Sequence, residues 1–292
     1  MKPSFAIIGC GKVGTTLANF LTQAGYKSAG MASKTLASAR NAADLAGIGK
    51  FSKINWDISR SADIIFITTP DSVIVEACLQ IADNGGFSEQ SIVFHCSGLL
   101  SSRILSPARR CGAAIGSMHP LQSFASKQIT QNPFKDIIIS AEGDPEAVSA
   151  ARIISTDLGA QFMEIKTEAK TLYHASAVVV SNYLVTLLDL AFKLIKDAGV
   201  PDKEAFKLFK PLIEGTLSNI ENVGIPQALT GPIERGDAET IVTHMDEIQS
   251  KKPELLSLYR QLGIHTIDIA TAKGSLSHAA VQKLEEVFLR KI

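Results

Sequence analysis

Lys170, Tyr173 and His174 form a short polar cluster in a stretch that is otherwise rich in alanine and valine. Lys170 and His174 are four residues apart, so a helix would place both side chains on one face. A lysine or histidine near a carbonyl carbon can donate a proton as a hydride arrives, which is the general-acid step of a dehydrogenase. The alternative is that Lys170 is exposed in a first helical turn and that His174 is a packed residue between domains.

His119 is a third candidate for proton transfer or substrate orientation. It comes directly before Pro120, and a residue before proline favours extended backbone, so the pair predicts the exit of a strand. A side chain at that place could face a bound cofactor. A packed, hydrogen-bonded histidine is the alternative, and His95 is expected to be such a structural residue inside a strand.

Three glycines, Gly9, Gly11 and Gly14, have the spacing G-x-G-x-x-G between a predicted strand and a predicted helix. This context is typical of a dinucleotide-binding turn, in which the glycines permit a tight turn, close approach to a pyrophosphate and helix–strand packing. The N–H groups at the helix start attract phosphate. The alternative is a glycine-rich turn that binds nothing, and Cys10 is interpreted as a small filler. The predicted cofactor loop is Gly9, Cys10, Gly11, Lys12, Val13 and Gly14.

The end of the second predicted strand indicates which cofactor the loop binds. An NAD site expects an acidic residue there, whereas this sequence has Ser33 and Lys34, with Arg40 soon after and no acid before Asp44. Serine and lysine can donate hydrogen bonds to a 2′-phosphate. The sequence therefore favours NADP, with NAD or F420 as alternatives, and Arg40 could equally be a solvated surface charge.

Small and polar residues follow two further predicted strands. Thr69 and Pro70 come after one, and Ser97 and Gly98 come after the next. Ligands of doubly wound folds lie at the carboxyl ends of the strands, so these four residues are predicted to line the nicotinamide side of the site. Asp71 could instead cap the helix that follows.

The composition excludes several classes of partner. The chain has 292 residues, with 29 basic and 29 acidic side chains and a net charge of zero. A nucleic-acid-binding protein usually has a basic excess, so a small-molecule substrate is expected instead. The four cysteines form no C-x-x-C pair, which argues against zinc and disulfides and fits a reducing cytoplasm. No metal site is predicted.

Two apolar stretches could be mistaken for membrane or export signals. The run before Cys10 is too short for a signal peptide. Residues 175–195 have the length of a membrane span but contain Asn182 and Asp189, so a helix buried between domains or subunits is expected. We therefore predict a cytoplasmic protein without a membrane segment.

The elements that must position these residues change in type along the chain. Up to residue 140, strands near 5–9, 28–32, 64–69, 91–95, 113–119 and 137–140 alternate with helices, which predicts an α/β fold with a Rossmann-type doubly wound sheet. One further helix and strand lie near 145–165, and from residue 167 onwards only helices are expected. We predict a dinucleotide-binding domain over 1–150 and a helical substrate or dimerisation domain over 151–292.

The turn-rich segment 229–241 is the last stretch with candidate chemistry. Arg235 could recognise an anionic substrate or the cofactor, or pair with Glu239. Asp237 is a natural N-cap for the helix that follows.

The segments "GCGKVGTTLA", "HPLQSF", "YHASAVVVSNY" and "LTGPIERGD" together resemble a family of proposed oxidoreductases. Its members join a Rossmann-like NADP-binding domain to a C-terminal helical domain of unknown function, and the resemblance covers residues 4 to 270. The layout is similar to that of pyrroline-5-carboxylate reductase and 6-phosphogluconate dehydrogenase. This resemblance implies a homodimer formed through the helical domain, which closes the site over the nicotinamide. Hydroxyacid dehydrogenases of that group have asparagine four residues after a catalytic lysine, whereas this sequence has Lys170 and His174.

Overall fold

The computed structural model describes residues 2–124 and 131–290, and it divides the chain into two compact units, Met1–Val180 and Ser181–Ile292. The sequence prediction placed the domain boundary at residue 150. The first unit extends further because the strand Gln161–Glu164 pairs with the sheet and Lys170 forms hydrogen bonds to it.

The first unit is built on one eight-stranded sheet with the order β3-β2-β1-β4-β5-β6-β7-β8. All neighbouring strands are parallel except β6 and β7, which are antiparallel. The strand order reverses between β1 and β4, which is the crevice where open α/β sheets bind ligands. The strands are β1 (Ser4–Ile8), β2 (Lys27–Ala32), β3 (Phe51–Ser52), β4 (Ile64–Ile67), β5 (Ile92–His95), β6 (Ala114–Pro120), β7 (Ile138–Gly143) and β8 (Gln161–Glu164).

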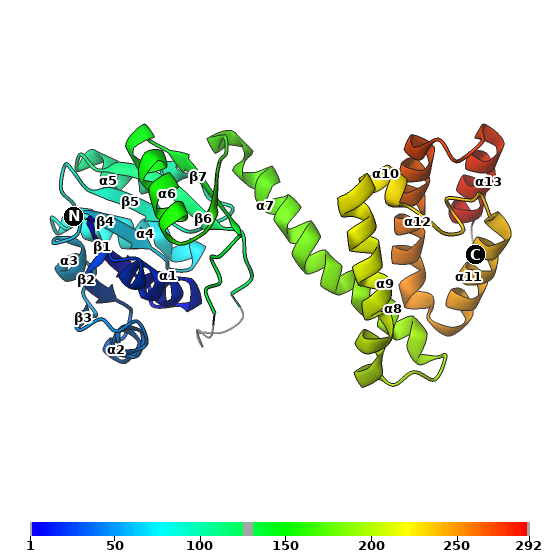
Figure 1. Ribbon diagram of the computed structural model, residues 1–292, viewed down its shortest axis with the longest axis horizontal. Coiled ribbons are helices and arrows are strands. Elements are labelled where there is room, and N and C mark those ends of the chain that lie inside the picture. The colour runs from blue at the N-terminus through cyan, green and yellow to red at the C-terminus, as the bar shows by residue number, and fades with distance from the viewer. Residues whose placement is uncertain (1, 125–130, 291–292) are drawn as a thin grey trace. The chain divides into compact units, whose positions relative to one another are not determined.

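Both faces of this sheet are covered by helices (Figure 1). Alternate residues of a strand point to opposite faces. Accordingly, Phe5 and Ile7 of β1 join a core with helices α1 (Lys12–Gln23), α2 (Leu36–Leu45) and α6 (Pro145–Asp157). Ala6 and Ile8 join a second core with α3 (Asn55–Ser59), α4 (Asp71–Asp83), η1 (Ser102–Leu105) and α5 (Ser106–Arg110). The predicted α/β sheet is therefore confirmed.

The sequence prediction missed β3 and α3, because a two-residue strand and a five-residue helix are too short to give a periodic pattern. Three short helical elements follow β8 at the end of the first unit. They are η2 (Thr167–Ala169), α7 (Lys170–Val178) and the π-helical turn η3 (Val179–Tyr183), whose last residues belong to the second unit.

The second unit contains only helices among its described residues. Its core gathers Ile241, Met245, Ile267 and Phe288. Asp237 accepts a hydrogen bond from the Thr240 amide at 3.1 Å, so the predicted N-cap is confirmed. The helices are α8 (Leu184–Lys196), α9 (Asp202–Val223), α10 (Ile225–Ala228), α11 (Ala238–Lys251), α12 (Pro253–Lys273) and α13 (His278–Leu289).

One helical run, Thr167–Lys196, is long and apolar enough to cross a membrane by length and composition, which is weak evidence for a span. Only 6% of its most apolar window is buried within the chain. The sequence predicts a buried helix here, whereas contacts within the chain bury little of this window.

Arg235, on the loop before α11, forms no ion pair among the described residues, and the neighbouring Glu234 pairs with Lys273 at 2.9 Å instead.

Candidate functional site

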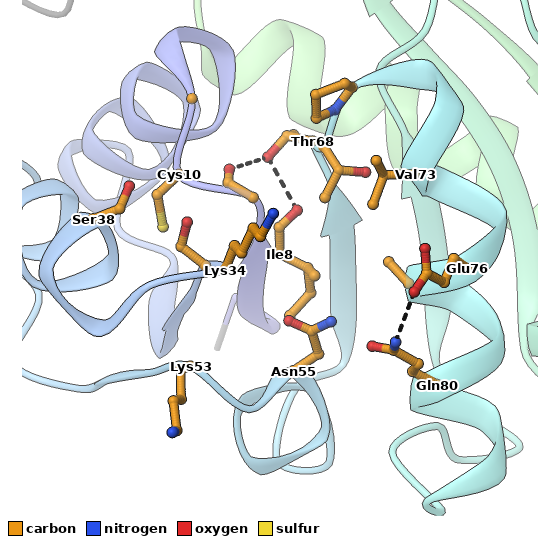
Figure 2. Close-up of a pocket in the computed structure, with 16 residues that line it drawn as sticks. Ile8, Cys10, Lys34, Ser38, Lys53, Asn55, Thr68, Val73, Glu76 and Gln80 are labelled. Atoms are coloured by element: carbon orange, nitrogen blue, oxygen red, sulfur yellow. Dashed lines mark hydrogen bonds between the residues drawn. The ribbon is translucent and has the colours of Figure 1, made fainter.

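A cavity of about 850 Å³ opens at the carboxyl ends of β1, β2 and β4. Figure 2 shows that it lies between the segment after β2, which carries Lys34 and Ser38, and helix α4, which carries Glu76 and Gln80. This is the ligand crevice predicted by the strand order. Its lining includes seven of the predicted cofactor residues, namely Gly9, Cys10, Gly11, Ser33, Lys34, Thr69 and Pro70.

The three motif glycines differ in what surrounds them. Gly9 has a φ of +109°, and a Cβ there would lie 2.6 Å from the Thr69 amide nitrogen. A Cβ at Gly14 would lie 2.2 Å from the Gly9 carbonyl oxygen and 2.3 Å from Thr68 Oγ1. Gly11 differs, because a Cβ there would meet no atom within 4 Å. Protein packing therefore explains Gly9 and Gly14, whereas Gly11 faces open space in the cavity.

The start of α1 fits a pyrophosphate. Gly11 is the N-cap residue, and among the described residues no side chain caps the first-turn amides of Lys12, Val13 and Gly14. Such amides have no partner within the helix and carry the positive end of its dipole. Thr69 adds a buried hydroxyl to the cavity wall, and this hydroxyl has no partner in the described part of the protein. These groups, together with the open space over Gly11, match the needs of a phosphate-bearing ligand.

Two lysines lie where the ribose end of a dinucleotide is expected. Lys34 follows β2 and Lys53 follows β3, and both line the cavity (Figure 2). They follow neighbouring strand ends, because β2 and β3 are parallel neighbours with Ala32 opposite Ser52. Neither lysine forms an ion pair in the part of the chain that the structure describes. Arg40 does not line the cavity, and its guanidinium lies 5.8 Å from the centre of the Phe51 ring.

Ser97 and Gly98 do not line this cavity. Ser97 is buried, and its hydroxyl donates to the Asp71 carboxylate at 2.7 Å and accepts from the Leu100 amide at 3.0 Å. The interpretation of Asp71 as an N-cap is wrong, because Pro70 occupies the N-cap position and Asp71 is the first residue of α4. The Asp71 carboxylate instead fixes the loop after β5 beside the cavity wall.

Lys170 is buried, with only 2% of its surface exposed, so the interpretation as a solvent-exposed residue is wrong. Its Nζ atom donates to the Ser97 carbonyl oxygen at 2.7 Å and to Ser117 Oγ at 2.6 Å. Burial lowers the pKa of Lys170 to about 8, while the negative charge of Glu142 opposes this shift. The amino group is therefore mostly charged at neutral pH but close to its titration point.

His119 lies next to this lysine cluster. Its Nδ1 atom is 3.1 Å from the Tyr173 hydroxyl, which accepts a hydrogen bond from Ser140 Oγ at 2.9 Å. Burial, and then the charges of Lys170 and His174, lower the pKa of His119 to about 4. His119 is therefore neutral at pH 7, with one ring nitrogen able to donate and the other to accept.

Gly98 brings His119 and His174 to one place. A Cβ at Gly98 would lie 2.8 Å from His174 Nδ1 and 2.9 Å from His119 Nε2, so any side chain there would displace both rings. The Nδ1 atom of His174 is buried and has no hydrogen-bond partner among the residues that the structure describes. The structure thus brings together all three residues predicted for proton transfer, in a cluster beside the cavity rather than in its lining.

His95 is fully buried in β5, as the sequence predicts. Its Nδ1 atom accepts a hydrogen bond from the Ser97 amide at 3.1 Å. Burial, and then the charge of Lys170, lower the pKa of His95 to about 3. His95 therefore supports the Ser97 loop as a neutral residue.

Several residues of the site were not predicted from the sequence. Lys53 directly follows the short strand β3, and Asn55 is the first residue of the short helix α3. Neither element was predicted, and in the sequence both residues resemble ordinary surface residues. Ser117 meets Lys170, and Glu142 meets Thr167 in the turn before Lys170, only because the sheet brings these distant segments together. The alternation of Ser117 and His119 along a strand was the one signal that could have indicated Ser117.

Comparison with known proteins agrees with this architecture. Residues 2–120 match the family model of a Rossmann-like domain, and residues 137–266 match the model of a domain of unknown function, DUF2520. The chain joins a Rossmann-like domain to a DUF2520 domain. His119 lies in the Rossmann-like match, whereas Lys170, Tyr173 and His174 lie in the DUF2520 match. The candidate cluster is thus formed by residues of both.

Three solved structures share the fold of this Rossmann-like and DUF2520 chain. One is described as a candidate NADP oxidoreductase of Bacteroides fragilis (23% identity, TM-score 0.73, 94% of this chain and 99% of that chain covered). The second is a pyrroline-5-carboxylate reductase of Coxiella burnetii (14%, 0.60, 98% and 99%). The third is a reductive aminase of Aspergillus terreus, solved with NADPH and ethyl-5-oxohexanoate (14%, 0.62, 98% and 92%). The comparison with curated proteins gave no match.

Proposed function

We propose that this protein is an NADP-dependent oxidoreductase that transfers a hydride to or from a small carbonyl, imine or hydroxy compound. The observation that carries the proposal is the cavity at the reversal of the strand order. It has an uncapped helix start and two lysines that form no ion pair over residues 2–124 and 131–290. The three structural neighbours described as NADP oxidoreductase, reductase and reductive aminase support the reaction class.

The cofactor would be held by the chain's own amides and cations. The loop Gly9–Gly14 would bind the pyrophosphate through the first-turn amides of α1. Ser33, Lys34 and Lys53 would bind the 2′-phosphate, because all three line the cavity at the ends of the neighbouring strands β2 and β3 and no acidic residue follows β2 directly. A bound nicotinamide cofactor supplies or accepts the hydride.

Lys170 and His119 are proposed to handle the proton that accompanies the hydride. Lys170 is mostly charged at neutral pH, so its ammonium group can donate a proton to a substrate oxygen or nitrogen. His119 is neutral and fixed by Tyr173, so it orients the substrate through Nε2 when the tyrosine hydroxyl donates to Nδ1. The unpartnered Nδ1 of His174 is a further hydrogen-bonding position in the same cluster.

Ligand binding tests the first half of this proposal. A thermal-shift titration with NADPH, NADH, FAD and F420 should show selective stabilisation by NADPH, because a ligand that binds only the folded state raises its stability by mass action. Loss of NADPH absorbance with a panel of carbonyl compounds and imines tests the second half. Absence of binding by all four cofactors would refute the proposal.

A non-catalytic NADP sensor is the alternative function. It predicts tight NADPH binding without turnover, and H119A and H174A variants that bind NADPH as wild type does. The pair of Lys170 and His119 favours the enzyme, because strongly shifted pKa values tend to gather at catalytic sites.

A homodimer formed through the helical unit is proposed as the assembly. Helices α8 and α9 expose large apolar side chains that their own unit leaves uncovered, and patches of this kind mark interaction sites. Light scattering coupled to gel filtration should give a molar mass of two chains. The V185E or L212E substitution should reduce the measured mass to that of one chain. The exposed residues are Val185, Leu187, Phe206, Leu208, Leu212, Leu217 and Val223.

A further inference from the structure

Glu142 is a buried carboxylate that the proposed chemistry does not use. It lies in β7, is 2% exposed, and accepts three hydrogen bonds. The Ser102 amide and hydroxyl donate to its two oxygens at 2.7 and 2.8 Å. Thr167 Oγ1 donates at 2.8 Å from the η2 turn that immediately precedes Lys170. Three donors from two separate segments thus converge on this one carboxylate.

The sheet register places this carboxylate beside the partner of Lys170. Strands β6 and β7 are antiparallel, and Ser117 is directly opposite Glu142. Directly opposite residues point to the same face of a sheet, so the Glu142 side chain lies on the face where Ser117 Oγ accepts from Lys170. Lys170 itself forms no ion pair among the described residues, and its two hydrogen-bond partners are neutral.

We propose that Glu142 is the positioning residue of Lys170: it fastens the first turn of the helix that carries the lysine, and its charge keeps the buried amino group cationic. A buried ammonium group with only neutral partners would lose its proton, because burial disfavours the charged form. Glu142 supplies the compensating charge without direct contact, so the third N–H group of Lys170, which Ser97 and Ser117 do not use, stays available for a substrate. This inference rests on the proposed function only for the use made of that proton.

The other groups around Lys170 do not replace Glu142. Asp71 on α4 is exposed to solvent, which screens its charge, and Cys96 after β5 is held as a neutral thiol because burial raises its pKa to about 12. His95 and His119, on β5 and β6, act in the opposite direction when protonated. Glu142 is therefore the only buried acid among the described groups that favour the charged lysine.

The titration of Lys170 tests the proposal without any substrate. In the full chain labelled with ¹³C at lysine Cε, NMR should show a resonance that is absent in K170M and titrates near pH 8. In E142Q, which keeps a similar shape without the charge, the midpoint should fall by about one pH unit or more. E142D should retain most of the wild-type value. A folded E142Q in which Lys170 titrates as in wild type would overturn the proposal.

Glu168 provides the matched control, because it lies two residues before Lys170 but is exposed and pairs with Arg103. E168Q should leave the Lys170 midpoint unchanged. If E142Q folds poorly, the double variant K170M/E142Q decides: E142Q should lower the Tm by less in the K170M background than in wild type, and equal losses would contradict coupling.

Activity separates this inference from the proposed function. If wild type binds NADPH and turns over a substrate, the rate of E142Q should fall and its pH profile should shift to lower pH with the lysine. If wild type shows no binding or turnover, the proposed function fails, while the lysine titration in E142Q still decides the role of Glu142.

Discussion

Lys170 donates a hydrogen bond of 2.7 Å to the backbone carbonyl of Ser97, a residue 73 positions earlier in the chain. This bond joins the start of helix α7 to the loop between β5 and η1. The same loop is tied to Asp71 at the start of α4, whose preceding residues line the cavity. The candidate proton-transfer cluster and the candidate cofactor cavity are therefore connected through one polar loop.

Gly11 and Gly14 should respond differently to the same substitution. G11A is expected to fold normally, because its Cβ would meet no protein atom within 4 Å, but to bind NADPH at least ten-fold more weakly. G14A should be destabilised by several kcal/mol, because its Cβ would lie 2.2 Å from the Gly9 carbonyl oxygen. Thermal melting and NADPH titration measure the two effects. Wild-type NADPH affinity in G11A would argue against a pyrophosphate over this glycine.

Lys34 and Lys53 should decide between phosphorylated and unphosphorylated cofactors. K34A and K53A should each weaken NADPH binding about ten-fold or more, because each removes one cation from the proposed 2′-phosphate site. Binding of NADH should change by less than about two-fold. Fluorescence titration measures all four affinities, and K50A, on an exposed lysine outside the cavity lining, is the control. Equal losses for both cofactors would remove the assignment of these lysines to the phosphate.

Gly98 should be essential for the histidine arrangement. G98A would place a methyl group 2.8 Å from His174 Nδ1 and 2.9 Å from His119 Nε2, so both rings must move. Turnover should fall about 100-fold or more, since small displacements of catalytic groups have large effects. NADPH binding should remain close to wild type, because Gly98 does not line the cavity. A fully active G98A would exclude both histidines from the reaction.

Acid should destabilise the protein through its buried histidines. His119 and His95 have pKa values lowered from 6.5 to about 4 and about 3, so the unfolded chain binds more protons than the folded chain below pH 6.5. Stability is therefore lost as the pH falls from about 6.5 towards 4, by about 1–2 kcal/mol for each histidine between pH 7 and 5. Urea unfolding should show a smaller loss in H119Q. An identical loss in H119Q would indicate that His119 titrates normally.

Lys170 should make the protein more stable as the pH rises on the alkaline side. Its pKa is lowered from 10.5 to about 8, so between these values the unfolded chain again holds the extra proton. The contribution of this group to stability therefore rises with pH, by about 1 kcal/mol between pH 8 and 9. The difference in unfolding free energy between wild type and K170M should increase by this amount. The comparison with K170M cancels the thiols Cys78 and Cys96, whose raised pKa values act in the other direction above pH 9.

The sequence by itself determined the α/β sheet, most of its order of elements and the position of the glycine-rich loop after β1. These features depend on local patterns, such as apolar runs, helix caps and the glycine spacing, which are readable over a few residues. The same local reading left β3 unrecognised and hence missed Lys53, since two residues carry no period. It also left open whether Lys170 is a proton donor or an exposed surface residue, because nothing near a lysine in the sequence shows what covers it.

Only the tertiary structure decided which candidates meet. The antiparallel pairing of β6 with β7 places Glu142 opposite Ser117, and helix α7 then brings Lys170 to the same place. Gly98, predicted for the nicotinamide side, proved to lie beneath two histidine rings from β6 and α7. Such encounters depend on strand register and on packing between segments more than 50 residues apart, and no local pattern encodes them.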